Sequence, residues 1–336
     1  MSITIDHVRV LEGPNIYYPQ AGVAATLQVS HDLRDELGRQ LKTWAQAVGL
    51  IIGYLRMKIE PRDEQTWQLN LSFTCNHPQL GAASLQHAVE DILAEERQDE
   101  DWSHDDALFD LRRQRMRIDP VLPLLQLRAE AQGRVIPVLP VGDGMLQLGT
   151  GSGGWRFDPA QLSLGLAVNP PWEQIRSVPL IAIGGLGAGL AAEQITHGLT
   201  AAGWQNVVHI AKGDYTSVRQ ALVQADAELF VVALDQADVV ERGLAFNRCT
   251  IGVVLGISDL PEEQALAAGL PALTADELGN TILLADDQRT AGLARRTAAP
   301  VVQLQRTQEP ANIQQPLLGL VVNQLQQLLD TGALDQ

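Results

Sequence analysis

The chain has 336 residues, enough for two domains, and its 46% hydrophobic and 19% charged residues exclude a wholly disordered protein. Its 40 acidic and 24 basic residues give a net charge of −16, which repels nucleic acid phosphates and anionic lipids. No apolar run is long enough to cross a bilayer, so we expect no nucleic acid and no membrane partner, and a cytoplasmic location.

The first half of the chain carries the pattern of an α+β domain. Alternating apolar residues predict strands at 3–11, 23–29 and 67–75, and helical spacing predicts helices at 35–52 and 85–96. The stretch 99–117 is acidic and then basic, which indicates either a solvated helix with internal ion pairs or a docking patch for a charged partner. The two cysteines, Cys75 and Cys249, are expected to be buried and reduced.

A glycine-rich and proline-marked stretch, residues 149–171, separates two patterns. We therefore place an N-terminal α+β domain at 1–150, a linker at 151–176 and an α/β domain at 177–310. Continuous apolar strands alternate with helices in the α/β domain, which predicts a mostly parallel, doubly wound sheet covered on both faces. Its expected elements are strands at 178–183, 207–211, 229–234, 250–257 and 280–285, and helices at 191–202 and 218–225.

The last segment, residues 311–336, is expected to be a C-terminal amphipathic helix. Leucines and valines between Pro316 and Leu334 recur on one side, and glutamines fill the other. Such a helix docks its apolar side either on the sheet or on a second subunit.

The strand-to-helix turn Ile183–Ala192 (IGGLGAGLAA) is the most informative local motif for chemistry. Glycines at a helix N-terminus free backbone N–H groups to approach an anion, so Gly185, Gly187 and Gly189 are candidate cofactor-binding residues. A P-loop also needs a lysine and a hydroxyl, and the turn has neither. The nearest following basic residue is Lys212, our candidate for reaching the turn.

Two other interpretations of this turn remain open. Residues 187–192 fit G-x-G-x-x-A, the dinucleotide fingerprint, and Asp214 follows the next strand where a ribose-binding acid is expected. Close packing of helix on strand explains the same glycines equally well.

Other catalytic patterns are absent from the sequence. The seven histidines show no metal-binding spacing, and no G-x-S-x-G elbow occurs, so we assign no catalytic residue and no metal ligand. The pair Asp286–Asp287 follows a predicted strand, where it fits a ribose or metal contact or, alternatively, a helix N-cap.

Several short segments, in order, resemble cyanophycin synthetase. Those resembling its N-terminal domain are Leu11–Asn15, Pro123–Gly133, Ile136–Leu139 and Gln147–Gly149, and those resembling its Mur-ligase-like ATPase half are Val178–Ile183, Glu241–Cys249 and Ala285–Asp287. Members of that family are ATP-dependent amide ligases that build an Asp backbone bearing Arg side chains. The resemblance implies a Mur-ligase-like, P-loop-type fold for the second domain.

The chain departs from that family at the positions that carry ATP chemistry. Only about 30 residues follow Gly149 before the Mur-like strand, which leaves no room for the family's ATP-grasp domain. The P-loop lysine and hydroxyl fall on Gly189 and Leu190, and the magnesium glutamate falls on Ala233. No histidine stands near Asp259, and Leu284 replaces an adenine-contacting asparagine. The ancestral ATP and Mg²⁺ are therefore predicted to be lost, with Lys212 and Asp286 vestigial.

These observations lead to the hypothesis of a non-catalytic paralogue of cyanophycin synthetase, a pseudoenzyme that acts as a binding, scaffold or regulatory protein without a cofactor. Its expected partners are a second copy of itself, a homologous ligase, or a peptide or polymer ligand at the N-terminal domain. One alternative is an amide ligase with an unorthodox or partner-completed site, to which Lys212, Arg248 or Arg289 supplies the charge. The other is an anion or dinucleotide site at the glycine turn.

Overall fold

The computed structural model describes residues 3–99, 101–305 and 314–331, and the chain divides into two compact units. The first unit comprises Met1–Asp119 with Glu241–Leu244, and the second comprises Pro120–Val240 with Ala245–Gln336. The main division therefore follows Asp119, about thirty residues before the boundary expected near residue 150.

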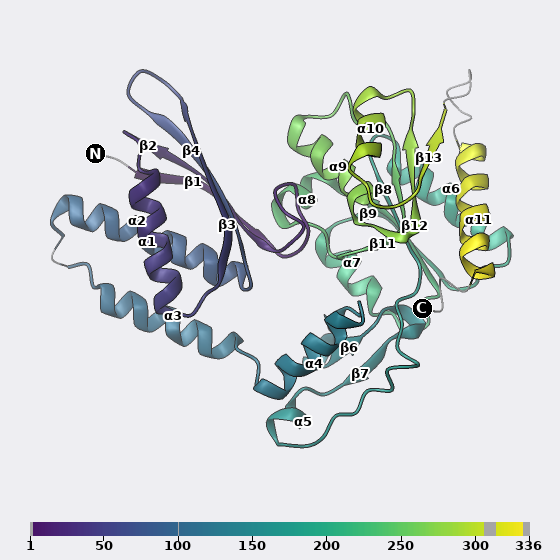
Figure 1. Ribbon diagram of the computed structural model, residues 1–336, viewed down its shortest axis with the longest axis horizontal. Helices are drawn as coiled ribbons and strands as arrows, with labels where there is room; N and C mark the ends of the chain where they lie inside the picture. Colours follow the sequence, from purple (N-terminus) through teal and green to yellow (C-terminus); the bar gives the residue numbers. More distant parts are fainter. Residues whose placement is uncertain (1–2, 100, 306–313, 332–336) are drawn as a thin grey trace. The chain divides into compact units, whose positions relative to one another are not determined.

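The first unit is an antiparallel sheet with helices on one face, as expected for an α+β domain (Figure 1). The strand order is β1-β2-β4-β3. The elements are β1 (Ile3–Leu11), β2 (Gly22–Val29), α1 (Arg34–Ala47), β3 (Ile52–Pro61), β4 (Trp67–Cys75), α2 (Pro78–Arg97) and α3 (His104–Ile118). Alternate residues of β2 and β4, such as Leu27 and Phe73, are buried against Trp44 of α1 and Leu85 of α2. This face of the sheet forms the core of the unit.

Two predicted segments of the first unit need correction or extension. The helix expected at 35–52 ends at Ala47, because Gly49 turns the chain with φ of +66° and Ile52 already begins β3. The part of the charged stretch from His104 onward forms the helix α3, which Ser103 caps by accepting the N–H of Asp106. Arg115 lies 2.7 Å from Asp119, an ion pair of the kind expected within a solvated helix.

The stretch expected to be a linker is packed. Residues 120–179 contain α4 (Leu122–Gly133), β5 (Val138–Pro140), β6 (Leu146–Leu148), β7 (Trp155–Phe157) and α5 (Ala160–Ser163), with a 3₁₀ turn on either side of β6. The three strands form an antiparallel sheet, and Phe157, Leu162 and Ile175 are buried in its cluster. At Gly151 a Cβ atom would lie 2.4 Å from the Ala227 carbonyl oxygen. Gly151 therefore permits close packing of the backbone. From composition alone, the glycine-rich stretch was interpreted as a linker.

The second unit contains the predicted parallel sheet, which has six strands in the order β13-β12-β11-β8-β10-β9. The strands are β8 (Leu180–Gly184), β9 (Val207–Gly213), β10 (Leu229–Leu234), β11 (Cys249–Val254), β12 (Ala275–Leu284) and β13 (Val301–Leu304). All five pairings are parallel, and Ile181 of β8 lies between Val231 and Ile251 of its neighbours. The expectation of a parallel α/β sheet is confirmed.

Helices cover both faces of this sheet (Figure 1). The remaining elements are α6 (Ala188–Ala201), α7 (Tyr215–Leu222), α8 (Gln236–Arg242), α9 (Glu262–Thr274), α10 (Gln288–Gly292), a 3₁₀ turn (Leu293–Arg295) and α11 (Gln314–Asp330). Helices α6 and α11 share one buried cluster with the strands, and α9 contributes Ala265, Ala268 and Ala272 to another cluster with Val254 and Leu283.

The C-terminal helix α11 docks on its own unit. Leu317, Val321 and Leu325 are buried in the cluster formed by α6 and the sheet. Its apolar side is therefore not free to bind a second subunit, which removes that route to self-association. The expected end at Leu334 and the expected start at residue 311 lie outside the described residues.

Both cysteines are buried and unpaired, as expected. Burial raises the pKa of Cys75 and of Cys249 to about 12, so neither thiol is reactive at neutral pH. Within the described parts of the chain, no helix combines the length and apolar character that crossing a membrane requires.

Candidate functional site

The glycine turn joins β8 to α6 at the carboxyl edge of the parallel sheet, the edge where open α/β sheets bind ligands. Gly185, Gly187 and Gly189 lie in this turn. Lys212 lies at the end of β9 and Asp286 follows β12, each two strands away from β8 and on opposite sides of it. The sheet thus places all five predicted residues at one edge. A Cβ atom on Gly189, in the first turn of α6, would lie 3.1 Å from the Ala211 carbonyl oxygen, so the backbone beside Lys212 approaches the glycines.

The glycines of the turn serve different purposes. A Cβ atom on Gly184 would lie 2.0 Å from the Ala268 carbonyl oxygen of α9, and one on Gly185 would lie 2.8 Å from that of Leu255. Gly187 has φ of +81° at the N-cap of α6 and no neighbour within 4 Å of a Cβ position. Packing thus explains Gly184, packing together with a φ of +98° explains Gly185, and the left-handed conformation explains Gly187.

The backbone donors of the turn are partly used within the fold. The N–H of Leu186 donates to the Gly256 carbonyl at 3.0 Å, and the N–H of Ala188 donates to the Gly185 carbonyl at 3.3 Å. Leu190, which stands where the resemblance puts a hydroxyl, has an apolar side chain that is 53% exposed. Two N–H groups of the turn are thus used within the fold, and an exposed leucine side chain stands where a phosphate site needs a cation or a hydroxyl.

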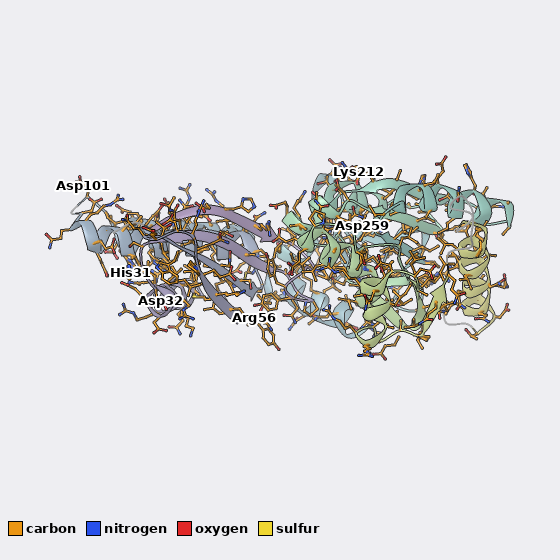
Figure 2. All side chains as sticks on the ribbon, turned by 90° about the horizontal axis from the view of Figure 1, so that it is seen from above. His31, Asp32, Arg56, Asp101, Lys212 and Asp259 are labelled. Atoms are coloured by element: carbon orange, nitrogen blue, oxygen red, sulfur yellow. The ribbon has the colours of Figure 1, made fainter. Side chains whose placement is uncertain are left out.

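Lys212 pairs with a neighbouring carboxylate and not with the glycine turn. Its Nζ lies 3.2 Å from Asp235 Oδ2, just after β10, and its side chain is 79% exposed at the surface of the unit (Figure 2). The residue that does reach the turn is Gln236, whose Nε2 donates to the Gly185 carbonyl at 3.4 Å. Arg248 precedes β11, so it stands at the opposite edge of the sheet and pairs with Asp276.

Two acidic residues near the candidate site, Asp287 and Asp214, cap helices. Asp287 accepts the N–H of Thr290 at 2.8 Å and also the N–H groups of Ile257 and Ser258, so it caps α10 and ties β12 to the segment after β11. Burial raises the pKa of Asp287, but these hydrogen bonds outweigh it and hold the pKa at about 2. Asp214 caps α7 through the N–H groups of Thr216 and Ser217, which lowers its pKa.

Replacing Asp287 with alanine should cost about 1–2 kcal/mol of stability at neutral pH, because it removes a cap and leaves three N–H groups without their acceptor. The folded-state pKa lies below the ordinary value of 3.8, so the contribution is present above about pH 4 and lost as the pH falls toward 2. Urea unfolding of the wild type and of D287A at pH 7 and at pH 3 measures the contribution of Asp287 to the free energy of unfolding at each pH. A difference between the two proteins that stays constant across these pH values would contradict it.

Two positions that carry ATP chemistry in the resembled family are core positions here. Ala233 in β10 and Leu284 in β12 are each only 1% exposed, within the cluster beneath α6 and α11. Metal and adenine ligands at these points would require polar side chains in an apolar core. Among the described residues, no group of three or more His, Cys, Asp or Glu side chains could hold a metal ion.

The first unit holds a polar cluster that the sequence did not indicate. The buried carboxylate of Asp91 accepts the indole N–H of Trp44 at 2.7 Å and that of Trp102 at 2.7 Å. His104 Nδ1 lies 3.2 Å from Asp91 Oδ2, and its ring lies against that of Trp44, tilted by 38°, with centroids 4.3 Å apart. These residues come from α1, α2 and the start of α3, so no local spacing connects them.

A family model described as "Domain of unknown function (DUF4938)" matches residues 2–273. The match covers the whole antiparallel sheet, the three-stranded sheet and the parallel sheet as far as α9. No curated protein matches the chain.

Proposed function

The chain belongs to the DUF4938 family, and we propose that it is a non-catalytic binding protein, a pseudoenzyme paralogue of cyanophycin synthetase that has lost the ATP site. The observation that carries the proposal is a glycine turn that is closed against α9 at Gly184 and bordered by the exposed apolar side chains of Leu186 and Leu190. Gly184 lies against α9, Leu190 is exposed at the position of a phosphate-site group, and Lys212 is paired with Asp235.

The size of the transition-state stabilisation that a cation and a metal ion supply supports the proposal that the protein does not turn over ATP. Phosphoryl transfer depends on a cation and a metal clamp around the transferring group, each worth several kcal/mol of transition-state stabilisation. The position of the metal glutamate is a buried alanine, Ala233. A protein that keeps the strands and loses these groups retains a scaffold, which suits a binding or regulatory role toward a homologous ligase or a peptide or polymer ligand.

We expect no increase in melting temperature when the purified 336-residue chain is titrated with Mg-ATP, Mg-ADP or NAD(P)H. A ligand at 100 times its Kd stabilises a protein by about 2.7 kcal/mol, which is a shift of a few degrees at this size. Phosphate release from Mg-ATP should match that of a heat-denatured control. A shift with Mg-ATP accompanied by turnover would refute the proposal and favour a ligase; a shift with NAD(P)H alone would favour a dinucleotide site.

A further inference from the structure

The outward face of α3 carries two large apolar side chains that the core of the first unit does not use. Helix α3 packs against α2 and buries Ala107 and Leu111 in the core (Figure 1). On its other side, Phe109 is 66% exposed and Met116 is 81% exposed. The other four phenylalanines of the chain are buried: Phe73, Phe157, Phe230 and Phe246. An exposed phenylalanine and an exposed methionine on one helix face are typical of a contact surface.

Charged side chains share this outward face in two blocks of opposite sign. The exposed charged residues are acidic in the first half of α3 and basic in the second half: Asp105, Asp106 and Asp110, then Arg112, Arg113 and Arg117. At 3.6 residues per turn, all six lie on or beside the face that carries Phe109 and Met116, opposite the buried residues.

Stabilisation of the helix by itself does not account for this pattern. The helix dipole favours acids in the first turn and bases in the last turn, which explains Asp105, Asp106 and Arg117. The dipole acts little in the middle of a helix, where Asp110 and Arg113 lie. It also gives no reason for apolar side chains to be exposed among the charges.

A second copy of α3, laid antiparallel on this face, brings opposite charges together. About a two-fold axis level with Leu111, residues equally far from that level in opposite directions meet. Asp105 then faces the partner's Arg117, and Asp110 faces the partner's Arg112. The two-fold symmetry repeats each pairing, so the surface is complementary to itself. A parallel arrangement would instead place like charges opposite each other.

The same arrangement covers the exposed apolar side chains. Phe109 faces the partner's Arg113, whose planar guanidinium can stack on the ring. Met116 comes within one helical turn of the partner's Phe109, where a thioether makes a favourable contact with an aromatic ring. The contact therefore joins apolar burial to charge pairing along the whole helix.

We propose that α3 is a self-association surface on which two copies of this chain dock in antiparallel orientation. A contact between two helices of about four turns is smaller than the roughly 1,200–2,000 Å² of stable interfaces, so the dimer is reversible, with a micromolar Kd. The net charge of −16 repels a second copy at long range, but at about 0.15 M salt this repulsion is screened beyond about 8 Å. The proposal does not rest on the loss of the ATP site.

Sedimentation velocity of the 336-residue chain at increasing micromolar concentration and about 0.15 M salt tests the proposal. We expect the mass to rise from that of one chain to that of two. The variants R113E/R117E and D105R/D106R should each stay monomeric, because like charges then face each other at both ends of the helix pair. An equimolar mixture of the two variants should dimerise again, because an acidic α3 then faces a basic one. Only folded variants in direct contact through α3 give this restoration.

F109A changes no charge and should weaken the dimer about tenfold, through the loss of an aromatic anchor. The matched control is R295E/R296E, which makes the same change of charge at two exposed arginines of the second unit. It should dimerise with a Kd within about twofold of the wild type. A wild type that stays monomeric throughout the micromolar range would overturn the proposal. So would a charge-reversal variant that still dimerises, a mixture that stays monomeric, or an equal loss in the control.

Discussion

Asp91→Ala should destabilise the first unit by about 3–5 kcal/mol, as expected when one partner of a buried charged network is removed. Trp44 is fully buried, so its indole N–H would lose its acceptor with no water to replace it. Trp102 and His104 would lose theirs as well, and these contacts hold the start of α3 against α1 and α2. Urea unfolding monitored by tryptophan fluorescence and far-UV circular dichroism measures the change.

A matched control for this prediction is Glu90→Gln on the same helix. Glu90 pairs with His87 at 2.7 Å, but its side chain is 32% exposed, so solvent screens the interaction and the loss should stay below about 1 kcal/mol. If D91A unfolds at the same urea concentration as E90Q, then Asp91 is not the structural centre of the three helices.

The second large effect is expected from Gly184→Ala, which should cost about 3 kcal/mol or more or prevent the second unit from folding. The added methyl group would meet the Ala268 carbonyl at 2.0 Å, and both groups belong to backbone that cannot move separately from β8 and α9. Thermal and urea denaturation of the purified variant, or its absence from the soluble fraction, reports the outcome.

Gly187→Ala provides the comparison within the same turn. Nothing lies near its Cβ position, so its cost comes only from the φ of +81° and should be about 1 kcal/mol. A Gly184 variant as stable as the Gly187 variant would contradict the packing explanation. It would also remove support for the proposed function, because that proposal uses the packing of α9 against Gly184.

The sequence was most informative where one physical signal dominates. Strands buried on both faces are continuously apolar, so β8 and β10 could be located to within two residues from hydropathy alone. The edge strand β3 contains only partly buried and exposed residues, so its hydropathy signal is weak. The helix predicted at 35–52 therefore included Ile52, which is the first residue of β3. Composition was misleading at residues 151–176, because glycine marks close packing as readily as flexibility.

Some features of the candidate site can be recognised in the sequence, and others appear only in the structure. The absence of a lysine and a hydroxyl from the glycine turn is a property of the sequence and needed no coordinates. Which carboxylate pairs with Lys212, and which backbone carbonyl fills the space beside Gly184, depend on strands that are far apart along the chain. Contacts between residues so far apart leave no regular spacing in the sequence from which they could be predicted.

The sequence by itself determined the α/β class, the parallel sheet, the burial of both cysteines and the absence of a lysine and a hydroxyl from the glycine turn, because each follows from local composition or periodicity. Only the tertiary structure decided where the units divide, that α11 docks on its own sheet, and that Asp91 joins two tryptophans to His104. These features require three-dimensional proximity between distant residues, which a pattern read along one chain does not contain.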